Sequence, residues 1–423
     1  MNNILIKNTN YLNENMEVQE HVSIVITEDK RLKILSSVCN ETEEAVECID
    51  GSNYLWMHGL CDNHMHTGQQ LLRGKILDEL PMIWTRIMLP FESTLTSEKM
   101  KLSAQLASLE MIRSGTTSFI DAGSYYMEAA AKVYLESGLR GNLTTSTMDN
   151  ENVSETIRHT AKEAVAINNR LYGEFHGQGN LSVSYSLRSL ISCTEELMEM
   201  VFETAKEKGA KVQAHMNEYP NEINHFLQKY QVRPFEYLEQ CNYLSKDFIA
   251  AHSILLSENE KRIIKENGIK TVHCPFSNCG KGLSDIPYLM ENDVRLSLGT
   301  DGTAHGGMSL WNEMKILRSI VNLNYGVSTA NPAIIPAKKI LKMATTSAVE
   351  NQSKVDLIGI NLNKPHLYPT GNKVNTLVES VVASDVEHMI VNGKFIMKNG
   401  EILTLDEERI MYEARKVCET CIL

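Results

Sequence analysis

Hydrophobic runs alternate with amphipathic stretches through most of the chain, from about residue 55 to about residue 350. Apolar, strand-like runs occur eight times, and stretches about as long as a crossover helix separate them. The expected strands lie at 55–64, 116–121, 141–146, 181–187, 211–216, 248–253, 270–275 and 294–300. Strands that alternate with helices indicate parallel βαβ units, and eight such units predict an α/β fold with a (β/α)8 barrel of the TIM type.

Amphipathic helices are expected between these strands. The stretch 97–114 places Met100, Leu106 and Leu109 among other apolar residues that leave one face largely hydrophobic. The stretch 194–208 is followed by Gly209, and glycine commonly ends helices. Similar patterns predict helices at 310–324 and 337–349.

Both ends of the chain have a different, strand-rich texture. Short β-rich runs lie at 3–7 and 22–27, and others follow the last barrel helix at 355–361, 377–382, 388–391 and 394–397. A closing helix is expected at 407–418. The simplest organisation is a small β domain made from residues 1–54 and 352–423, interrupted by the barrel at 55–351.

Composition and charge narrow the class of protein. Hydrophobic residues make up 43% of the chain and charged residues 22%, which excludes a disordered chain, a collagen and a coiled coil. The net charge of −12 argues against a nucleic-acid or membrane-surface partner, because such partners select a basic surface. The nine cysteines are scattered and odd in number, and the N-terminus lacks the features of a signal peptide. We therefore expect a soluble, cytoplasmic protein of enzyme size.

Polar residues that suit metal binding and proton transfer fall at the ends of the predicted strands. His64 and His66 lie two apart at the end of the first strand, so both imidazoles can reach one ion. In a barrel the carboxyl ends of the strands meet over one face, where active sites are built. The polar residues on the later strands or at their ends are His215, Glu218, His252, His273 and Asp301.

Several motifs resemble those of the amidohydrolase superfamily, in the deaminase and chlorohydrolase branch often called ATZ/TRZ. The motifs stand in family order and at family spacing over nearly the whole chain: GLCDNHMHTGQQLLRG, LPMIWTRIMLPFE, EMIRSGTTSFID, VQAHMNE, IAAHSILLS, VHCPFSN and LSLGTDG. The resemblance implies a (β/α)8 barrel with a β-sandwich built from both chain ends. It also implies a homo-oligomer.

The resemblance further implies a ligand set for one divalent metal ion, zinc or iron, made of His64, His66, His215 and Asp301. Glu218 and His252 then take the proton-transfer and hydroxide-orienting roles, with Asp301 assisting. Three imidazoles and a carboxylate suit Zn²⁺ or Fe²⁺ and can leave a position for water. Two-metal members carry a carboxylated lysine on the fourth strand, whereas that strand reads LSVSYSL here, which favours one metal.

The expected substrate-binding residues resemble two branches of the family. Gln69 and Arg188 resemble residues of guanine deaminases, in which an arginine precedes a cysteine by five positions. Trp84 and Glu92 look more like the adenosine branch, where the glutamate grips ribose. The loop with His305 replaces the usual Asn-rich loop after the aspartate, so the substrate end of the pocket is altered. The chain also looks shorter than its relatives between Thr346 and Asp356.

Three functions are therefore compatible with the sequence, and each acts on a small N-heterocyclic molecule. The leading hypothesis is a deaminase of a small cyclic amidine with a neighbouring carbonyl, such as guanine or creatinine. The second is a deaminase of adenosine derivatives such as methylthioadenosine or S-adenosylhomocysteine. The third is a metal-dependent ring-opening or dechlorinating hydrolase.

Overall fold

The fold is described from a computed structural model, which covers residues 3–36, 45–79, 83–151, 155, 157–348 and 355–420. It is a mixed α/β fold with parallel sheets, as the alternating pattern predicts. Two parallel five-stranded sheets and one nine-stranded sheet make up its strands.

The two parallel sheets contain strands at all eight expected positions. One sheet runs in the order β15 (Asp301–Gly302), β6 (Leu60–His66), β7 (Thr116–Asp121), β8 (Arg140–Leu143) and β9 (Leu181–Val183). The other runs in the order β10 (Tyr185–Leu187), β11 (Val212–Met216), β12 (Phe248–His252), β13 (Lys270–His273) and β14 (Arg295–Leu298). Only Ser184 separates β9 from β10, and only Gly299 and Thr300 separate β14 from β15.

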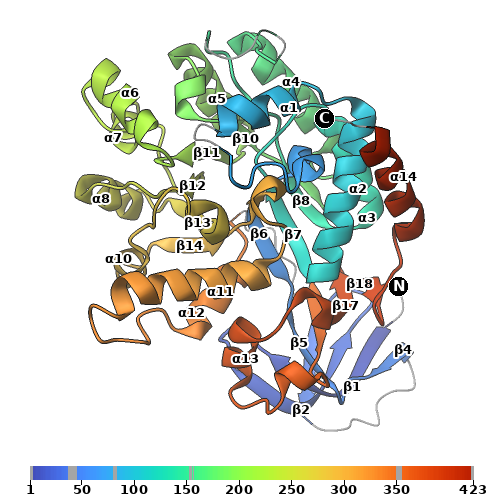
Figure 1. The fold of residues 1–423 in the computed structure, drawn as a ribbon. Helices are drawn as coiled ribbons and strands as arrows, with labels where there is room; N and C mark the ends of the chain where they lie inside the picture. The colour runs from blue at the N-terminus through green and yellow to red at the C-terminus, as the bar shows by residue number, and fades with distance from the viewer. Residues whose placement is uncertain are drawn as a thin grey trace.

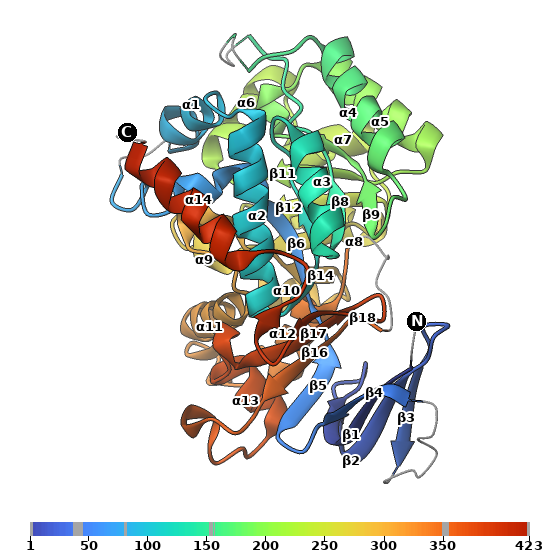
Figure 2. The same cartoon turned by 90° about the vertical axis from the view of Figure 1, so that its right-hand side faces the viewer.

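Helices lie outside the parallel strands, as Figures 1 and 2 show. The longer ones are α2 (Ser97–Ser114), α3 (Met127–Ser137), α4 (Ala161–Phe175), α5 (Glu195–Lys208), α6 (Pro220–Tyr230), α8 (Glu258–Glu266), α11 (Leu310–Val321) and α12 (Ala337–Thr345). The sequence sets the bounds of α2 locally, because Thr96 accepts a hydrogen bond from the Lys99 N–H and Gly115 ends the helix at φ +84°.

The nine-stranded sheet joins the two ends of the chain. Strand β5 (Tyr54–His58) lies between β1 (Asn3–Leu12), with which it pairs in parallel, and β16 (Leu357–Asn361), with which it pairs antiparallel. The other strands are β2 (Val18–Ile26), β3 (Leu32–Ser36), β4 (Ala45–Asp50), β17 (Val386–Val391), β18 (Lys394–Lys398) and β19 (Glu401–Ile402). In both views β1 and β2 lie beside β5 and below the parallel strands, and α14 (Glu407–Thr420) runs along α2.

The hydrophobic core is continuous between the parallel strands and this sheet. One group of buried side chains includes Leu60 on β6, Trp311 on α11 and Met389 on β17. A second group, which includes Ile24 and Trp56, fills the N-terminal part of the nine-stranded sheet.

The predicted single strand at 55–64 is wrong, because it is two strands in two different sheets. The chain changes sheets at Gly59, between β5 and β6. A Cβ atom at Gly59 would lie 2.1 Å from Thr117 Oγ1, so only glycine fits where the backbone passes this close to β7.

The predicted strand at 377–382 is also wrong, because its first half belongs to helix α13 (Lys373–Glu379) and the rest is not a strand. Val374, Leu377 and Val378 are buried and recur at helical spacing. The Asn372 side chain accepts hydrogen bonds from the Val374 and Asn375 N–H groups and so begins the helix.

Residues 349–354 lie outside the described residues, so the shortness of the segment between Thr346 and Asp356 stays a prediction. Within the described part of the chain, no helix combines the length and hydrophobicity that a membrane crossing requires.

Candidate active site

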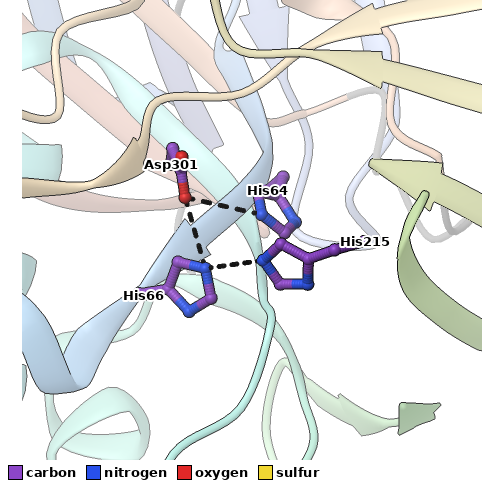
Figure 3. A group of neighbouring side chains, drawn as sticks. All are labelled: His64, His66, His215 and Asp301. Atoms are coloured by element: carbon purple, nitrogen blue, oxygen red, sulfur yellow. Dashed lines mark hydrogen bonds and ion pairs between the residues drawn. The ribbon is translucent and has the colours of Figure 1, made fainter. Parts of the chain in front are cut away.

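Three histidines and an aspartate meet at the carboxyl ends of the parallel strands. Figure 3 shows their side chains pointing toward one another. The His66 Nε2 atom lies 3.2 Å from His215 Nε2 and 3.3 Å from Asp301 Oδ1, and His64 Nε2 lies 3.7 Å from the same oxygen. The structure thus brings together all four residues that the sequence suggests as metal ligands, with one ligand atom of each within 4.8 Å of the others.

The local backbone explains how these side chains converge. His64 and His66 are two residues apart on β6, so their rings leave the same side of the strand. His252 and Asp301 have positive φ angles of 65° and 60°, which side-chain-bearing residues rarely adopt. Such unusual backbone often lies at functional sites, and here it turns the chain at the two strand ends that carry these side chains.

The electrostatics of this group suit a divalent cation. Burial lowers the pKa of His66 to about 3, so its imidazole is neutral at physiological pH. Burial raises the pKa of Asp301, but the Lys281 ammonium and the nearby imidazoles overcome this and hold it well below its ordinary value. The buried His64 Nε2 atom has no hydrogen-bond partner among the described residues. Neutral imidazoles with a free lone pair and an ionised carboxylate are suitable donors for zinc or iron.

Glu218 and His252 lie next to this group. The Glu218 Oε1 atom is 3.7 Å from His252 Nε2, and these two residues with Asp301 form a second close cluster of titratable groups. Burial lowers the pKa of His252 to about 4, so this ring is also neutral near pH 7. The pair therefore places a carboxylate and a neutral imidazole where they can exchange protons with a bound molecule.

A cavity of about 50 Å³ opens beside the histidines and Glu218. Four of the five residues that we expect to bind substrate line it, namely Gln69, Trp84, Arg188 and His305. The fifth, Glu92, lines a different cavity of about 280 Å³ together with Tyr125 and Met127. Glu92 thus stands behind the wall of the smaller cavity.

Arg188 and Glu92 form a buried ion pair in that wall. Arg188 Nη2 donates to Glu92 Oε1 at 2.8 Å, and both side chains are almost fully shielded from solvent. The same oxygen accepts a hydrogen bond from Gln69 Nε2 at 3.1 Å. Arg188 Nη1 also donates to the Gly123 carbonyl at 2.9 Å and lies 3.1 Å from His66 Nδ1. Arg188 therefore connects the metal-ligand group to the expected substrate-binding residues.

Gly302 makes room for the Gln69 side chain. A Cβ atom at this position would lie 1.7 Å from Gln69 Oε1, which no real structure tolerates. The glycine after Asp301 therefore determines where the Gln69 amide can lie.

The amidohydrolase family model matches residues 56–360, which include all of these residues. The chain belongs to the amidohydrolase family. Among curated relatives, the 5'-deoxyadenosine deaminase of Methanobrevibacter smithii is 32% identical, with 99% of this chain and 98% of that protein aligned. The 5-methylthioadenosine/S-adenosylhomocysteine deaminase of Thermoanaerobacter pseudethanolicus is 30% identical over 99% of both chains.

Solved structures of the family have the same fold. An adenosine deaminase from Xanthomonas campestris with bound zinc superposes with a TM-score of 0.90 at 21% identity, over 98% of each chain. The family and the named activities of these relatives show that this amidohydrolase is a hydrolytic deaminase, which is a hydrolase that acts on C–N bonds.

Sequence reasoning gave no role to three residues that follow β13 and contact Asp301, His252 and Glu218. Their contacts are Ser277 Oγ to Asp301 Oδ2 at 2.5 Å, Asn278 Oδ1 to His252 Nδ1 at 3.0 Å, and Lys281 Nζ to Glu218 Oε1 at 2.6 Å. The motif VHCPFSN contains two of them at a strand end, and that position was the available signal. His273, by contrast, makes its side-chain hydrogen bond with Thr271 within β13.

Proposed function

We propose that this amidohydrolase deaminates a small, free cyclic amidine with a carbonyl next to the ring nitrogen, such as guanine or creatinine. The buried Arg188–Glu92 ion pair in the wall of the cavity carries this proposal. The chemistry of that pair favours a carbonyl-bearing base over a nucleoside, for two reasons.

The first reason is that Arg188 offers hydrogen-bond donors to a carbonyl oxygen. A guanidinium has five N–H groups, and the hydrogen bonds to the Gly123 carbonyl and Glu92 engage two of them. Gln69 adds an amide, which can both donate and accept along a ring edge. A site built on such bonds rejects analogues without the carbonyl by up to about 10⁴–10⁵-fold, because its polar groups would stay unpaired.

The second reason is that one carboxylate oxygen of Glu92 is already engaged. Glu92 Oε1 accepts hydrogen bonds from Arg188 and Gln69, whereas the buried Oε2 atom has no hydrogen-bond partner among the described residues. A ribose-binding glutamate would therefore have only this second oxygen for the sugar hydroxyls. This engagement favours a ring without a sugar.

We propose that His64, His66, His215 and Asp301 hold one divalent metal ion, zinc or iron. The close approach of their donor atoms supports this, as does the absence of lysine in LSVSYSL, the segment of β9 and β10. When bound, such a metal lowers the pKa of a water ligand from about 15.7 towards about 7 and so supplies hydroxide at neutral pH.

We assign the proton transfers to residues beside this group. Burial raises the pKa of Glu218, but His252 and Lys281 outweigh this and hold it below its ordinary value, so Glu218 is ionised at rest. With Asp301 assisting, Glu218 therefore takes a proton from the attacking water and passes it to the ring nitrogen of the substrate. Asp301 accepts the remaining hydroxyl proton of the adduct, and Glu218 and His252 relay it to the departing ammonia, for which their separation of 3.7 Å supports a shared role. General acid–base steps of this kind contribute about 10²–10⁴-fold each.

Deamination of an adenosine derivative is the second candidate function. Curated relatives that match almost the whole chain at 30–32% identity are named as deaminases of 5'-deoxyadenosine or of methylthioadenosine and S-adenosylhomocysteine. For such a substrate, Glu92 would bind ribose through its Oε2 atom, which has no hydrogen-bond partner among the described residues, or through opening of the Arg188–Glu92 pair.

An ammonia-release assay separates these functions. The purified, metal-loaded protein is given guanine, creatinine, 5'-deoxyadenosine, methylthioadenosine and a chlorinated triazine, and a Glu218→Gln preparation controls for contaminating deaminases. We expect ammonia from a free carbonyl-bearing amidine and little from the nucleosides. Efficient turnover of methylthioadenosine, with none of the two free compounds, would overturn the proposal and make Glu92 a ribose ligand. Chloride or ring-opened product without ammonia would favour the third class of hydrolase.

We further propose that the two parallel sheets form one (β/α)8 barrel over residues 55–351. Segment 181–187 pairs with β8 on one side and with β11 on the other, which supports a closed circle. Segment 295–302 likewise pairs with β13 and with β6. The nine-stranded sheet then belongs to a small β-sandwich domain of residues 1–54 and 352–423. A crystal structure tests this arrangement, and sedimentation tests the expected homo-oligomer.

A further inference from the structure

Lys281 is a buried lysine directly behind the proposed proton carrier. Its side chain is 5% exposed, and its Nζ atom lies 2.6 Å from Glu218 Oε1 and 3.6 Å from Asp301 Oδ2. It also donates to Ser277 Oγ at 2.7 Å. Among the described residues that line the cavity, Glu218 is present and Lys281 is not. Lys281 therefore contacts Glu218 from outside the lining of the cavity.

The contacts of the Glu218 carboxylate are unequal. Both of its ionic contacts with described residues, to Lys281 and to His252, use Oε1. The side chain is still 15% exposed and lines the cavity. One oxygen is thus held from behind, while the carboxylate as a whole borders the space where a substrate binds.

We propose that Lys281 is a positioning residue for Glu218, which fixes Oε1 so that Oε2 faces the substrate. This proposal rests on the proton-transfer role of Glu218 in the proposed function. Lys281 does not touch the substrate, and it acts through the orientation of the Glu218 carboxylate.

The charges in the cluster explain why a cation is needed there. Glu218 and Asp301 each place a carboxylate oxygen in the same close cluster of ligand atoms. Two carboxylates so close together repel each other strongly in a buried site. The single ammonium of Lys281 contacts both, so it holds the two carboxylates in place at this short separation.

The first arm of the test is structural and needs no substrate. Crystal structures of the zinc-loaded protein are compared between the wild type and Lys281→Met, with metal content measured on the same samples. We expect the variant to keep its metal, because Lys281 is not a ligand, and to show the Glu218 carboxylate displaced. An unmoved Glu218 carboxylate would overturn the proposal. Lys281→Gln replaces Lys281→Met should the latter not fold.

The second arm uses kinetics with the compound that the ammonia-release assay identifies. We expect Lys281→Met to lower kcat about 100-fold in the wild-type background. In a Glu218→Gln background the same substitution should lower kcat further by less than about threefold, because residues that act as a unit are not additive. Two losses that multiply would show that Lys281 does not act through Glu218.

Lys261 provides a matched control. Its Nζ atom also bonds two carboxylates, Glu258 and Asp285, both at 2.8 Å, and its side chain is 9% exposed. It lies on α8, away from the cavity, so Lys261→Met should leave kcat within about twofold of the wild type while it removes a comparable ion pair. If Glu218→Gln itself keeps full kcat, the proposed function of Glu218 fails. The crystal structures of the wild type and Lys281→Met then still decide whether Lys281 fixes the position of the Glu218 carboxylate.

Discussion

Glu218 is the central proton carrier in the proposed mechanism, because it borders the cavity and contacts both His252 and Lys281. Glu218→Gln keeps the size of the side chain but cannot carry a proton. We expect the variant to retain its metal and to lose about 10²–10⁴-fold in kcat. Metal analysis and steady-state kinetics on one preparation check this, and His252→Asn should behave similarly. A Glu218→Gln protein with near-wild-type kcat would mean that the assigned mechanism is wrong.

Arg188 links substrate recognition to stability. Arg188→Ala should cost about 2–3 kcal/mol in kcat/KM on a carbonyl-bearing amidine, the size of a lost charged hydrogen bond. It should also lower the free energy of unfolding by about 3–5 kcal/mol, because Glu92 would stay buried without its partner. Urea denaturation and kinetics measure the two effects separately.

A second substitution separates these two roles of Arg188. Adding Glu92→Gln removes the unpaired charge, so it should recover stability but not kcat/KM. Recovery of both would show that Arg188 acts only as the partner of Glu92, and an unchanged kcat/KM in Arg188→Ala would count against the proposed substrate.

Glu222 gives the protein a specific dependence of stability on pH. Burial raises the pKa of this carboxyl from its ordinary 4.5 to about 8. The folded state therefore keeps a proton that the unfolded chain releases, and stability falls as the pH rises from about 4.5 to about 8. Glu222→Gln should match the wild type near pH 4.5 and be more stable near pH 8. Thermal unfolding across this range checks the sign, and exposed Glu196→Gln should follow the wild type throughout.

At the level of residues, the strand-end pattern predicted that His64, His66, His215 and Asp301 lie on one face with other polar residues, and the resemblance to the amidohydrolases implied that these four are the metal ligands. The sequence did not reveal the Arg188–Glu92 bond, because the two residues are 96 positions apart and only the folded chain brings them together. Lys281 was missed for a related reason. Its role depends on a loop conformation after β13 that no periodic pattern encodes.

At the level of elements, local signals predicted best where they agreed with the hydrophobic pattern. The expected bounds of α2 match the structure, because a threonine cap and a left-handed glycine enclose an apolar face. The prediction failed at 55–64, where a continuous apolar run hides a change of sheet. It failed at α13, where valines suggested a strand although the buried positions recur at helical spacing.

Helix α13 gives a test at this scale. Asn372 accepts hydrogen bonds from two N–H groups of the first turn, which otherwise have no partner in the helix. Asn372→Ala should lower the free energy of unfolding by about 1 kcal/mol, the usual cost of a lost N-cap. Asn375→Ala, on the exposed side of the same helix, is the matched control and should be neutral or slightly stabilising. Equal effects of the two substitutions would contradict the capping role.

At the scale of the whole molecule, the topology is what assembles the site. Parallel strands place their carboxyl ends along one edge, so His66 on β6, His215 on β11 and Asp301 on β15 come together from remote parts of the chain. This convergence could be predicted from the order of elements. The size of the cavity could not, because side chains such as Trp84 and His305 come from connections whose path the pattern leaves open.

The same topology makes metal binding a property of the whole fold. The four proposed ligands come from three strands, so a bound ion would link β6, β11 and β15 and would stabilise only the folded chain. Removal of the metal with a chelator should therefore abolish activity and also lower Tm, since a ligand that binds only the native state stabilises it by mass action. Zn²⁺ or Fe²⁺ should restore both, whereas Mg²⁺, which prefers oxygen ligands, should not.

Elemental analysis of active protein should give one ion per chain, because β9 and β10 offer no lysine to bridge a second. Two ions per chain in active protein would contradict this prediction. A Tm that does not change when the chelator is added would show that the metal does not join the three strands.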